Sequence, residues 1–337
     1  MSRSLCVKPS YIFPILAAFV GGLLTAGAQD GLFVSKRLTP MDEYTFQIEG
    51  PAVDREGNLY VGNLKIKDDP KNGGAIGRVA VGEKKSTLFA ILPVSKVGTK
   101  LIKSKTSGIR FDRDGRMYAT DFNNHNIFVF EPGQSTPNVY FRSTDFHQPN
   151  DLAIARDGTL YASDPLRPKG VPASGRIWRI RRGTDGKGVG EIMSGPAMGA
   201  TNGIDLSPDE KTLYVSEADT NKVRAFQIDG AKLTGGSPIA TFGEPKKSFD
   251  LDGLRTDVTG LLFVTQNGAG KIVILNPDGK EARRPVATVG KNPSNLTFGG
   301  PDGKTVFVTQ TDGGFVEFFR VDQPGREFCK PFTDTAC

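Results

Sequence analysis

Residues 202–217 read NGIDLSPDEKTLYVSE, and this stretch decides the fold because five other parts of the chain repeat its pattern. Each copy has a strand-like alternation of apolar residues, a tight turn, and a second strand rich in Leu, Tyr, Phe or Val. Five copies carry glycine at the turn, where positive φ costs little, as in a hairpin. The other copies are residues 49–63, 107–121, 150–164, 252–266 and 295–310.

The spacing of the copies predicts how they assemble. The turn residues are Gly57, Gly115, Gly158, Glu210, Gly260 and Gly303. A third strand follows several copies, for example NIFVFEP at 126–132. Self-similarity at roughly 40–50 residues, with several strands per unit, is typical of a β-propeller. We therefore expect an all-β protein, a six-bladed β-propeller whose sheets bury their faces against each other.

The first 28 of the 337 residues resemble a removable leader. Arg3 and Lys8 give a basic start, residues 15–24 are uncharged and mostly apolar, and residues 26–28 read Ala-Gly-Ala. This pattern predicts a secretory signal peptide over 1–28. The apolar run is too short for a bilayer core, which takes about 20 residues. A retained anchor is the alternative. We expect a secreted or periplasmic protein with no membrane span after cleavage.

We expect residues 29–322 to form the propeller and residues 323–337 to form a C-terminal tail. A candidate strand within 31–38 would close the ring by adding to the blade that contains residues 315–321. Cys6 leaves with the leader, so Cys329 and Cys337 remain as an even pair in an exported protein. A disulfide between them is expected, with two unpaired thiols as the alternative.

The charge pattern excludes one class of partner. The formal net charge is +6, from 43 Lys and Arg against 37 Asp and Glu. These residues are scattered, with neither a long basic run nor a basic stripe interleaved with aromatic residues. We interpret them as a solvated surface and expect no nucleic-acid binding.

One position of the repeat carries oxygen-bearing side chains, eight residues before each turn. In a propeller the first strand of each blade lines the central channel, so these side chains should converge at the channel mouth. Turn capping is the alternative, and it applies most to the hydroxyl and the last amide. The six residues are Glu49, Ser107, Asn150, Asn202, Asp252 and Asn295.

Such a ring predicts a divalent metal, and Ca²⁺ fits best because it takes six to eight oxygen ligands. Mg²⁺, Mn²⁺ and Zn²⁺ are the alternatives. A zinc site of the usual nitrogen and sulfur type would need His or Cys ligands, and the chain has only two His. His125 is expected in a turn or strand. His147, three residues before Asn150, would overlook the channel.

At these residues the sequence resembles the senescence marker protein/gluconolactonase family, six-bladed metal-dependent lactonases that include regucalcin. The most specific stretch is TNGIDLSPDEKTLYVSEADTNKVRAF at 201–226, and others are EGPAVDREGNLYV at 49–61, PNDLAIARDG at 149–158 and LDGLRTD at 251–257. The resemblance implies metal ligation by Glu49, Asn202 and Asp252. It implies that Asn150 binds substrate or metal. Gln148 stands where sugar-lactone members carry Arg, which favours neutral lactones and esters.

The resulting hypothesis is a calcium-dependent hydrolase of lactones or related esters. Asp252 would orient or deprotonate the attacking water. Asn150, Gln148 and His147 would contact the small-molecule substrate, and His147 would protonate the leaving oxygen. A non-catalytic propeller, pinned by calcium and binding a ligand or protein at its mouth, is the alternative. A lyase-like propeller enzyme is a third, and it would need a well-placed His.

Overall fold

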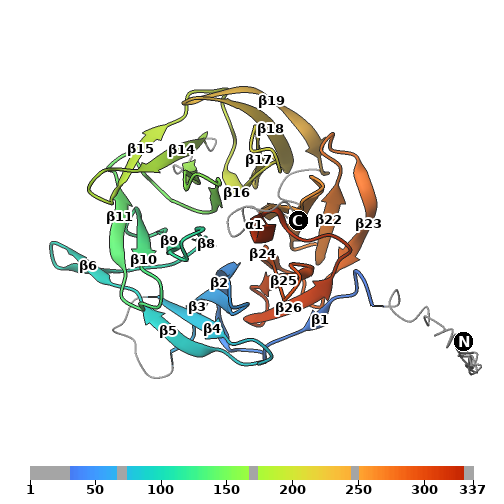
Figure 1. Ribbon diagram of the computed structural model, residues 1–337, viewed down its shortest axis with the longest axis horizontal. Helices are drawn as coiled ribbons and strands as arrows, with labels where there is room; N and C mark the ends of the chain where they lie inside the picture. Colours follow the sequence, from blue (N-terminus) through green and yellow to red (C-terminus); the bar gives the residue numbers. More distant parts are fainter. Residues whose placement is uncertain (1–30, 67–73, 167–173, 244–249, 330–337) are drawn as a thin grey trace, which may run out of the picture. The chain divides into compact units, whose positions relative to one another are not determined.

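Six four-stranded antiparallel sheets are arranged around one axis in the computed structural model (Figure 1). The structure describes residues 31–66, 74–166, 174–243 and 250–329. The six sheets lie in one unit that begins at Leu32. The predicted six-bladed β-propeller is confirmed. The expected leader at 1–28 lies outside the described residues.

The blades follow each other along the chain, and the first strand of each lies nearest the axis (Figure 1). The first blade contains β2 (Tyr44–Val53), β3 (Leu59–Leu64), β4 (Ala75–Val79) and β5 (Thr87–Ile91). The second contains β8 (Ile109–Phe111), β9 (Met117–Asp121), β10 (Asn126–Phe130) and β11 (Asn138–Arg142). The third contains β12 (Leu152–Ile154), β13 (Leu160–Leu166), β14 (Ser174–Arg182) and β15 (Gly188–Ile192).

The fourth blade contains β16 (Thr201–Leu206), β17 (Thr212–Glu217), β18 (Lys222–Asp229) and β19 (Lys232–Thr241). The fifth contains β20 (Asp250–Thr256), β21 (Leu262–Asn267), β22 (Lys271–Leu275) and β23 (Glu281–Ala287). The last contains β24 (Pro293–Gly299), β25 (Thr305–Gln310), β26 (Phe315–Arg320) and β1 (Lys36–Arg37). Outside the blades lie the hairpin of β6 (Val94–Val97) and β7 (Lys100–Lys103), and the helix α1 (Arg326–Cys329).

The turn position of the repeat is confirmed in every blade. All six predicted turn residues have positive φ and join the first two strands of their blades. In the fourth blade this residue is Glu210, with φ of 61°. A side chain in this region is uncommon, so the shared conformation reflects the hairpin geometry and not only the presence of glycine.

The ring closes by joining the two ends of the propeller chain. In β1, Lys36 pairs with Phe318 of β26, and Phe33 N donates to Arg320 O at 2.8 Å. The strand expected within 31–38 therefore joins the predicted blade, although it is only two residues long. The inner strands β2, β8, β12, β16, β20 and β24 contact each other in a closed circle.

The hydrophobic core lies between neighbouring blades. One cluster joins β9 and β10 of the second blade to strands of the third, and Trp178 in it is 4% exposed. The Trp178 ring centroid lies 5.5 Å from that of Phe141 and 5.2 Å from that of Phe146. Burial of these faces supplies the main stabilisation of the ring. The inner strands thus have rigid support when they present side chains to the channel.

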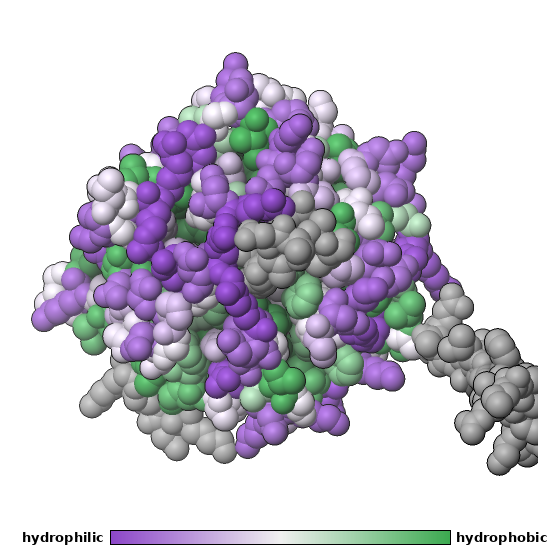
Figure 2. Space-filling model, in the orientation of Figure 1, coloured by the Kyte–Doolittle hydropathy of each residue, from purple (hydrophilic) through white to green (hydrophobic). Residues whose placement is uncertain are grey.

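The surface agrees with the charge pattern of the sequence. Figure 2 shows hydrophilic residues spread over one face, with hydrophobic residues in small scattered groups. Within the part of the chain that the structure describes, no helix has the length and apolar character needed to cross a membrane.

Candidate metal and substrate site

A cavity of about 330 Å³ lies where the inner strands begin, and we call it the mouth pocket. Five of the six side chains predicted to converge at the channel line it: Glu49, Ser107, Asn150, Asn202 and Asp252. The other lining residues are Phe46, Gln47, Lys105, Phe122 and Thr311. The structure therefore brings together five predicted residues that span 203 positions of the chain, from Glu49 to Asp252.

Glycines beside the polar residues explain how the inner strands approach so closely. A Cβ atom on Gly203 would lie 2.3 Å from Leu254 N, and one on Gly253 would lie 2.3 Å from Asn295 Oδ1. Real Cβ contacts are not this short, so any side chain there would push neighbouring blades apart. The Asn-Gly and Asp-Gly pairs of the repeat therefore place Asn202 and Asp252 on adjacent strands at the pocket.

The electrostatics of the pocket are dominated by two carboxylates. Burial raises the pKa of Glu49 well above its usual range, and the negative charges of Asp252 and Asp151 raise it further. Lys105 acts in the opposite direction on this pKa. Placing like charges together in a desolvated site is costly without a cation. The pocket thus favours binding of a positive ion.

Asn202 supplies the clearest sign of a missing ligand partner. Its Oδ1 atom is buried and has no hydrogen-bond partner in the structure. A buried polar atom of this kind costs free energy unless something pairs with it. A divalent ion held by Glu49, Asn202 and Asp252 would pair with this oxygen and offset both carboxylates. The donor set of carboxylate and amide oxygens suits Ca²⁺.

The donor types also limit the choice of metal. Over the described ranges, no group of three or more His, Cys, Asp or Glu side chains could hold a metal ion. A metal at the mouth pocket would therefore depend on amide oxygens from Asn202 and Asn150 beside the two carboxylates. Hard cations such as Ca²⁺ accept such amide oxygens, whereas zinc sites favour nitrogen and sulfur.

Two further residues that contact or face the pocket carboxylates were missed in the sequence. Lys105 lines the pocket, and its Nζ lies 5.3 Å from the ring centroid of Phe122. Burial lowers the pKa of Lys105, while Glu49 and Asp252 raise it again. Asn267 on β21 donates from Nδ2 to Asp252 Oδ2 at 3.0 Å. The sequence offers one signal for Lys105, its position two residues before Ser107, which belongs to the repeated polar position.

Asn295, the sixth residue of the predicted ring, has a different position. Its side chain is 1% exposed, and its Oδ1 accepts from Arg255 Nη2 at 3.2 Å and from Leu296 N at 2.8 Å. It does not appear among the described lining residues of the mouth pocket. Asn295 therefore serves a buried structural network, in agreement with the turn-capping alternative stated for it.

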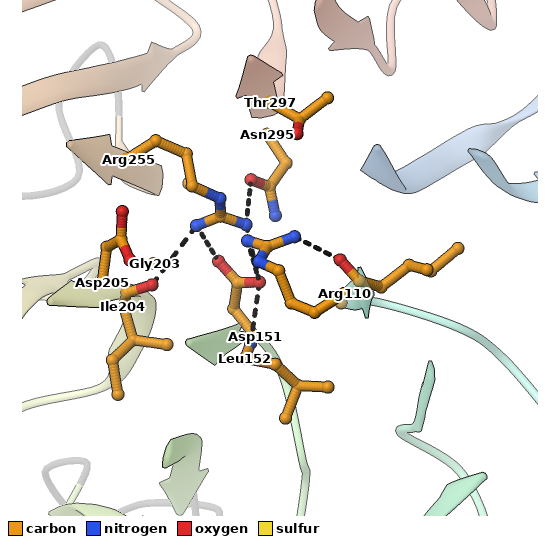
Figure 3. A network of polar contacts seen from close by, with 12 residues as sticks. Arg110, Asp151, Leu152, Gly203, Ile204, Asp205, Arg255, Asn295 and Thr297 are labelled. Carbon is orange, nitrogen blue, oxygen red and sulfur yellow. Dashed lines mark hydrogen bonds and ion pairs between the residues drawn. The ribbon is translucent and has the colours of Figure 1, made fainter. Parts of the chain in front are cut away.

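Figure 3 shows this network, in which two guanidinium groups converge on Asp151. Arg255 donates to both carboxylate oxygens at 2.8 and 2.9 Å, and Arg110 Nη2 lies 3.1 Å from Oδ1. All three side chains are at most 1% exposed. Asp151 directly follows Asn150, so the paired charges fix the segment before β12 that carries this pocket residue.

Gln148 and His147 lie elsewhere. Neither is among the described residues that line the mouth pocket. The backbone N–H of Gln148 donates to Asp164 Oδ1 at 2.7 Å, and His147 lines a neighbouring cavity. Their roles in substrate binding stay predictions, as do the roles of the five pocket residues named from the sequence.

The comparison with known proteins agrees with this geometry. Residues 93–312 match the model of the SMP-30/Gluconolactonase/LRE-like region. The chain belongs to the SMP-30/gluconolactonase/LRE-like family. The curated proteins that it resembles include a gluconolactonase of Zymomonas mobilis subsp. mobilis, 26% identical over 92% of this chain and 95% of that protein. The diisopropyl-fluorophosphatase of Loligo vulgaris is 23% identical, over 84% of this chain and 91% of that one.

Solved structures show the same fold. A calcium-binding regucalcin from Agrobacterium tumefaciens superimposes with a TM-score of 0.64 at 18% identity, covering 88% of this chain and 99% of that chain. A gluconolactonase from Xanthomonas campestris gives 0.63 at 20% identity, covering 86% and 89%. These SMP-30/gluconolactonase-like neighbours support the six-bladed architecture.

Proposed function

We propose that this protein is a metal-dependent hydrolase that opens lactones or related esters at the mouth pocket, with Ca²⁺ as the ion. The observation that carries the proposal is the unpartnered Oδ1 of Asn202, which shares its pocket with Glu49 and Asp252. Two relatives named gluconolactonase and lactonase drp35 support the reaction class.

The proposed metal would be held by Glu49, Asn202 and Asp252, and Asn150 would complete the shell or bind the substrate. When bound, such an ion polarises an ester carbonyl and stabilises the negative charge that develops on its oxygen. The ion would add its positive charge to that of Lys105 beside the two carboxylates.

Asp252 is the proposed general base. Asn267 holds one of its oxygens by a hydrogen bond of 3.0 Å, which fixes the orientation of the carboxylate. In the proposed step, water attacks the carbonyl carbon and gives a proton to Asp252. The bond between the carbonyl carbon and the ring oxygen breaks, and the leaving oxygen takes a proton to give a hydroxy acid. Lys105 adds positive charge beside the two carboxylates.

A panel of lactones and aryl esters tests the proposal. The purified protein should hydrolyse members of the panel, lose this activity in chelator, and regain it when Ca²⁺ is added. A protein that binds Ca²⁺ with full affinity but turns over no lactone or ester would instead support the non-catalytic, calcium-pinned propeller.

A further inference from the structure

The only two histidines of the chain line the same cavity, which has a volume of about 390 Å³. We call it the basic cavity. Four of its twelve lining residues are basic, and none of the twelve is Asp or Glu. Hydroxyl and amide side chains make up most of the polar remainder. The basic residues are Lys96, His125, Arg142 and His147. A lining of donors without carboxylates suits an anionic group.

Two buried carboxylates contact residues of the cavity wall, while the exposed Asp145, between Thr144 and Phe146, is not among the lining residues. Asp121 is fully buried, and its oxygens accept from Asn124 Nδ2 at 2.9 Å and from Asn126 Nδ2 at 3.2 Å. Asp164 is also fully buried and accepts from the backbone N–H of His147 at 3.2 Å. Both carboxylates therefore accept hydrogen bonds from residues of the cavity wall and are not themselves exposed in the cavity.

His125 occupies a backbone position that other blades give to smaller residues. It directly precedes the third strand of its blade and has φ of 58°. The same position holds Asn221, Gly270 and Gly314 in the last three blades, all with positive φ. Most residues with a side chain are uncommon in this region, but histidine and asparagine are both enriched there. The turn therefore accommodates the imidazole, and His125 lines the basic cavity.

The basic cavity lies beside the mouth pocket, because three segments supply residues to both. Phe122 lines the mouth pocket and the next residue, Asn123, lines the basic cavity, about 3.8 Å apart along the backbone. Ile102 lines the basic cavity, and Lys105, three residues later, lines the mouth pocket. His147 lines the basic cavity, and Asn150 lines the mouth pocket. The ammonium group of Lys105, over the ring of Phe122, stands at the border between the two.

We propose that the basic cavity is a second subsite, which binds an anionic oxygen group of a substrate whose lactone or ester bond lies in the mouth pocket. This rests on the proposed function. It identifies the substrate class as a lactone or ester with a phosphate or carboxylate on its far end. Lys96 and Arg142 supply the charge, His125 and His147 add ring nitrogens, and Lys105 favours entry of the anion.

A hydrogen bond orients the Arg142 side chain for anion binding. Its Nε donates to Asn126 Oδ1 at 2.6 Å, which fixes the guanidinium plane. Asn126 is in turn 1% exposed and held by Asp121. A guanidinium fixed in this way loses less freedom when it binds an oxyanion.

A matched pair of substrates tests the subsite. Glucono-δ-lactone and its 6-phosphate share the same ring ester and differ by the anionic group. Wild type should show a higher kcat/KM for the phosphate. In the double variant Lys96→Gln, Arg142→Gln the ratio of the two values should fall roughly ten- to hundredfold, because hydrogen bonds to charged groups are lost. Lys280→Gln, at a side chain 82% exposed in another blade, is the control and should keep the wild-type ratio.

His125→Asn gives a second variant that keeps the fold, since asparagine occupies the same turn position at residue 221. Its melting temperature should equal or exceed that of wild type while the ratio falls. A ratio that stays at the wild-type value in both variants would overturn the subsite and leave the proposed function intact.

Calorimetric titration of metal-free protein with inorganic phosphate tests the anion site independently of lactone hydrolysis. Wild type should bind phosphate and the Lys96→Gln, Arg142→Gln variant should not. If binding behaves in this way but no lactone is hydrolysed, the anion site stands and the proposed function fails. Equal phosphate binding by wild type and variant, or none by wild type, would contradict the site.

Discussion

Asn267 donates a hydrogen bond of 3.0 Å to Asp252, and the two residues lie on neighbouring strands of one blade. Since Asp252 is the proposed base, Asn267→Ala should lower kcat more than it changes KM. Loss of a hydrogen bond to a charged group is worth about 1.5–3 kcal/mol, or roughly a ten- to hundredfold change in rate. Steady-state kinetics on a lactone measures this. Equal loss in the exposed control Asn138→Ala would show that the contact has no special role.

The C-terminal helix carries a fully buried ion pair. Arg326 Nη2 lies 2.6 Å from Asp205 Oδ1, and Arg326 Nη1 donates to Ile154 O at 3.2 Å. Arg326→Met leaves a buried charge on Asp205 and should lower the free energy of unfolding by about 3–5 kcal/mol. Urea unfolding measures it. The double variant Arg326→Met, Asp205→Asn should recover part of the loss, whereas a single variant as stable as wild type would contradict the role of the helix.

An exposed ion pair in the last blade predicts a pH effect. The hydrogen bond from Arg320 lowers the pKa of Asp302 to about 2, although burial acts in the opposite direction. A lowered folded-state pKa means that the pair stabilises the fold above about pH 4 and that this contribution disappears as the pH falls toward 2. Asp302→Asn should therefore melt slightly below wild type at pH 7, with the gap closing between pH 4 and 2. Because Asp302 is 47% exposed, salt should shrink the gap. A gap that widens in acid would contradict this assignment.

The chain ends carry two predictions from the sequence. Residues 1–28 should be removed on export, and Cys329 should be bonded to Cys337. Cys337 lies outside the described residues. Intact-mass measurement after thiol alkylation, on protein from its native compartment, checks both. A mass that includes the leader, or two alkylated cysteines, would contradict the corresponding prediction.

The sequence predicts the ring and most of the mouth pocket because both depend on one repeated register. Each blade places the same position at the channel, so counting from the turn finds Glu49, Asn202 and Asp252. Asn295 shows the limit of this count, since a neighbouring Arg255 captures its side chain. The register alone does not predict which of these polar residues lines the pocket and which is buried in a hydrogen-bond network.

Other features depend on contacts that no repeat encodes. Lys105 and Asn267 stand outside the counted position. Lys105 lines the mouth pocket, and Asn267 reaches Asp252 from the next strand. Arg326 lies in a segment expected as a tail, yet its burial follows from pairing with Asp205, 121 residues earlier. The motif suggests an effect of Gln148 on substrate choice, and this stays a prediction. The cationic side chain that lines the mouth pocket is Lys105, which no motif indicates.

Calcium titration of metal-free protein by calorimetry tests the central claim most directly. Wild type should bind one Ca²⁺, and Glu49→Gln and Asp252→Ala should each weaken binding at least tenfold, because each removes a charged oxygen ligand. Circular dichroism should show both variants folded, since packing between blades stabilises the ring. Ser107→Ala, which removes an uncharged pocket group, is the matched control. Ca²⁺ affinity unchanged in both carboxylate variants, or no binding by wild type, would contradict a metal site at the mouth pocket.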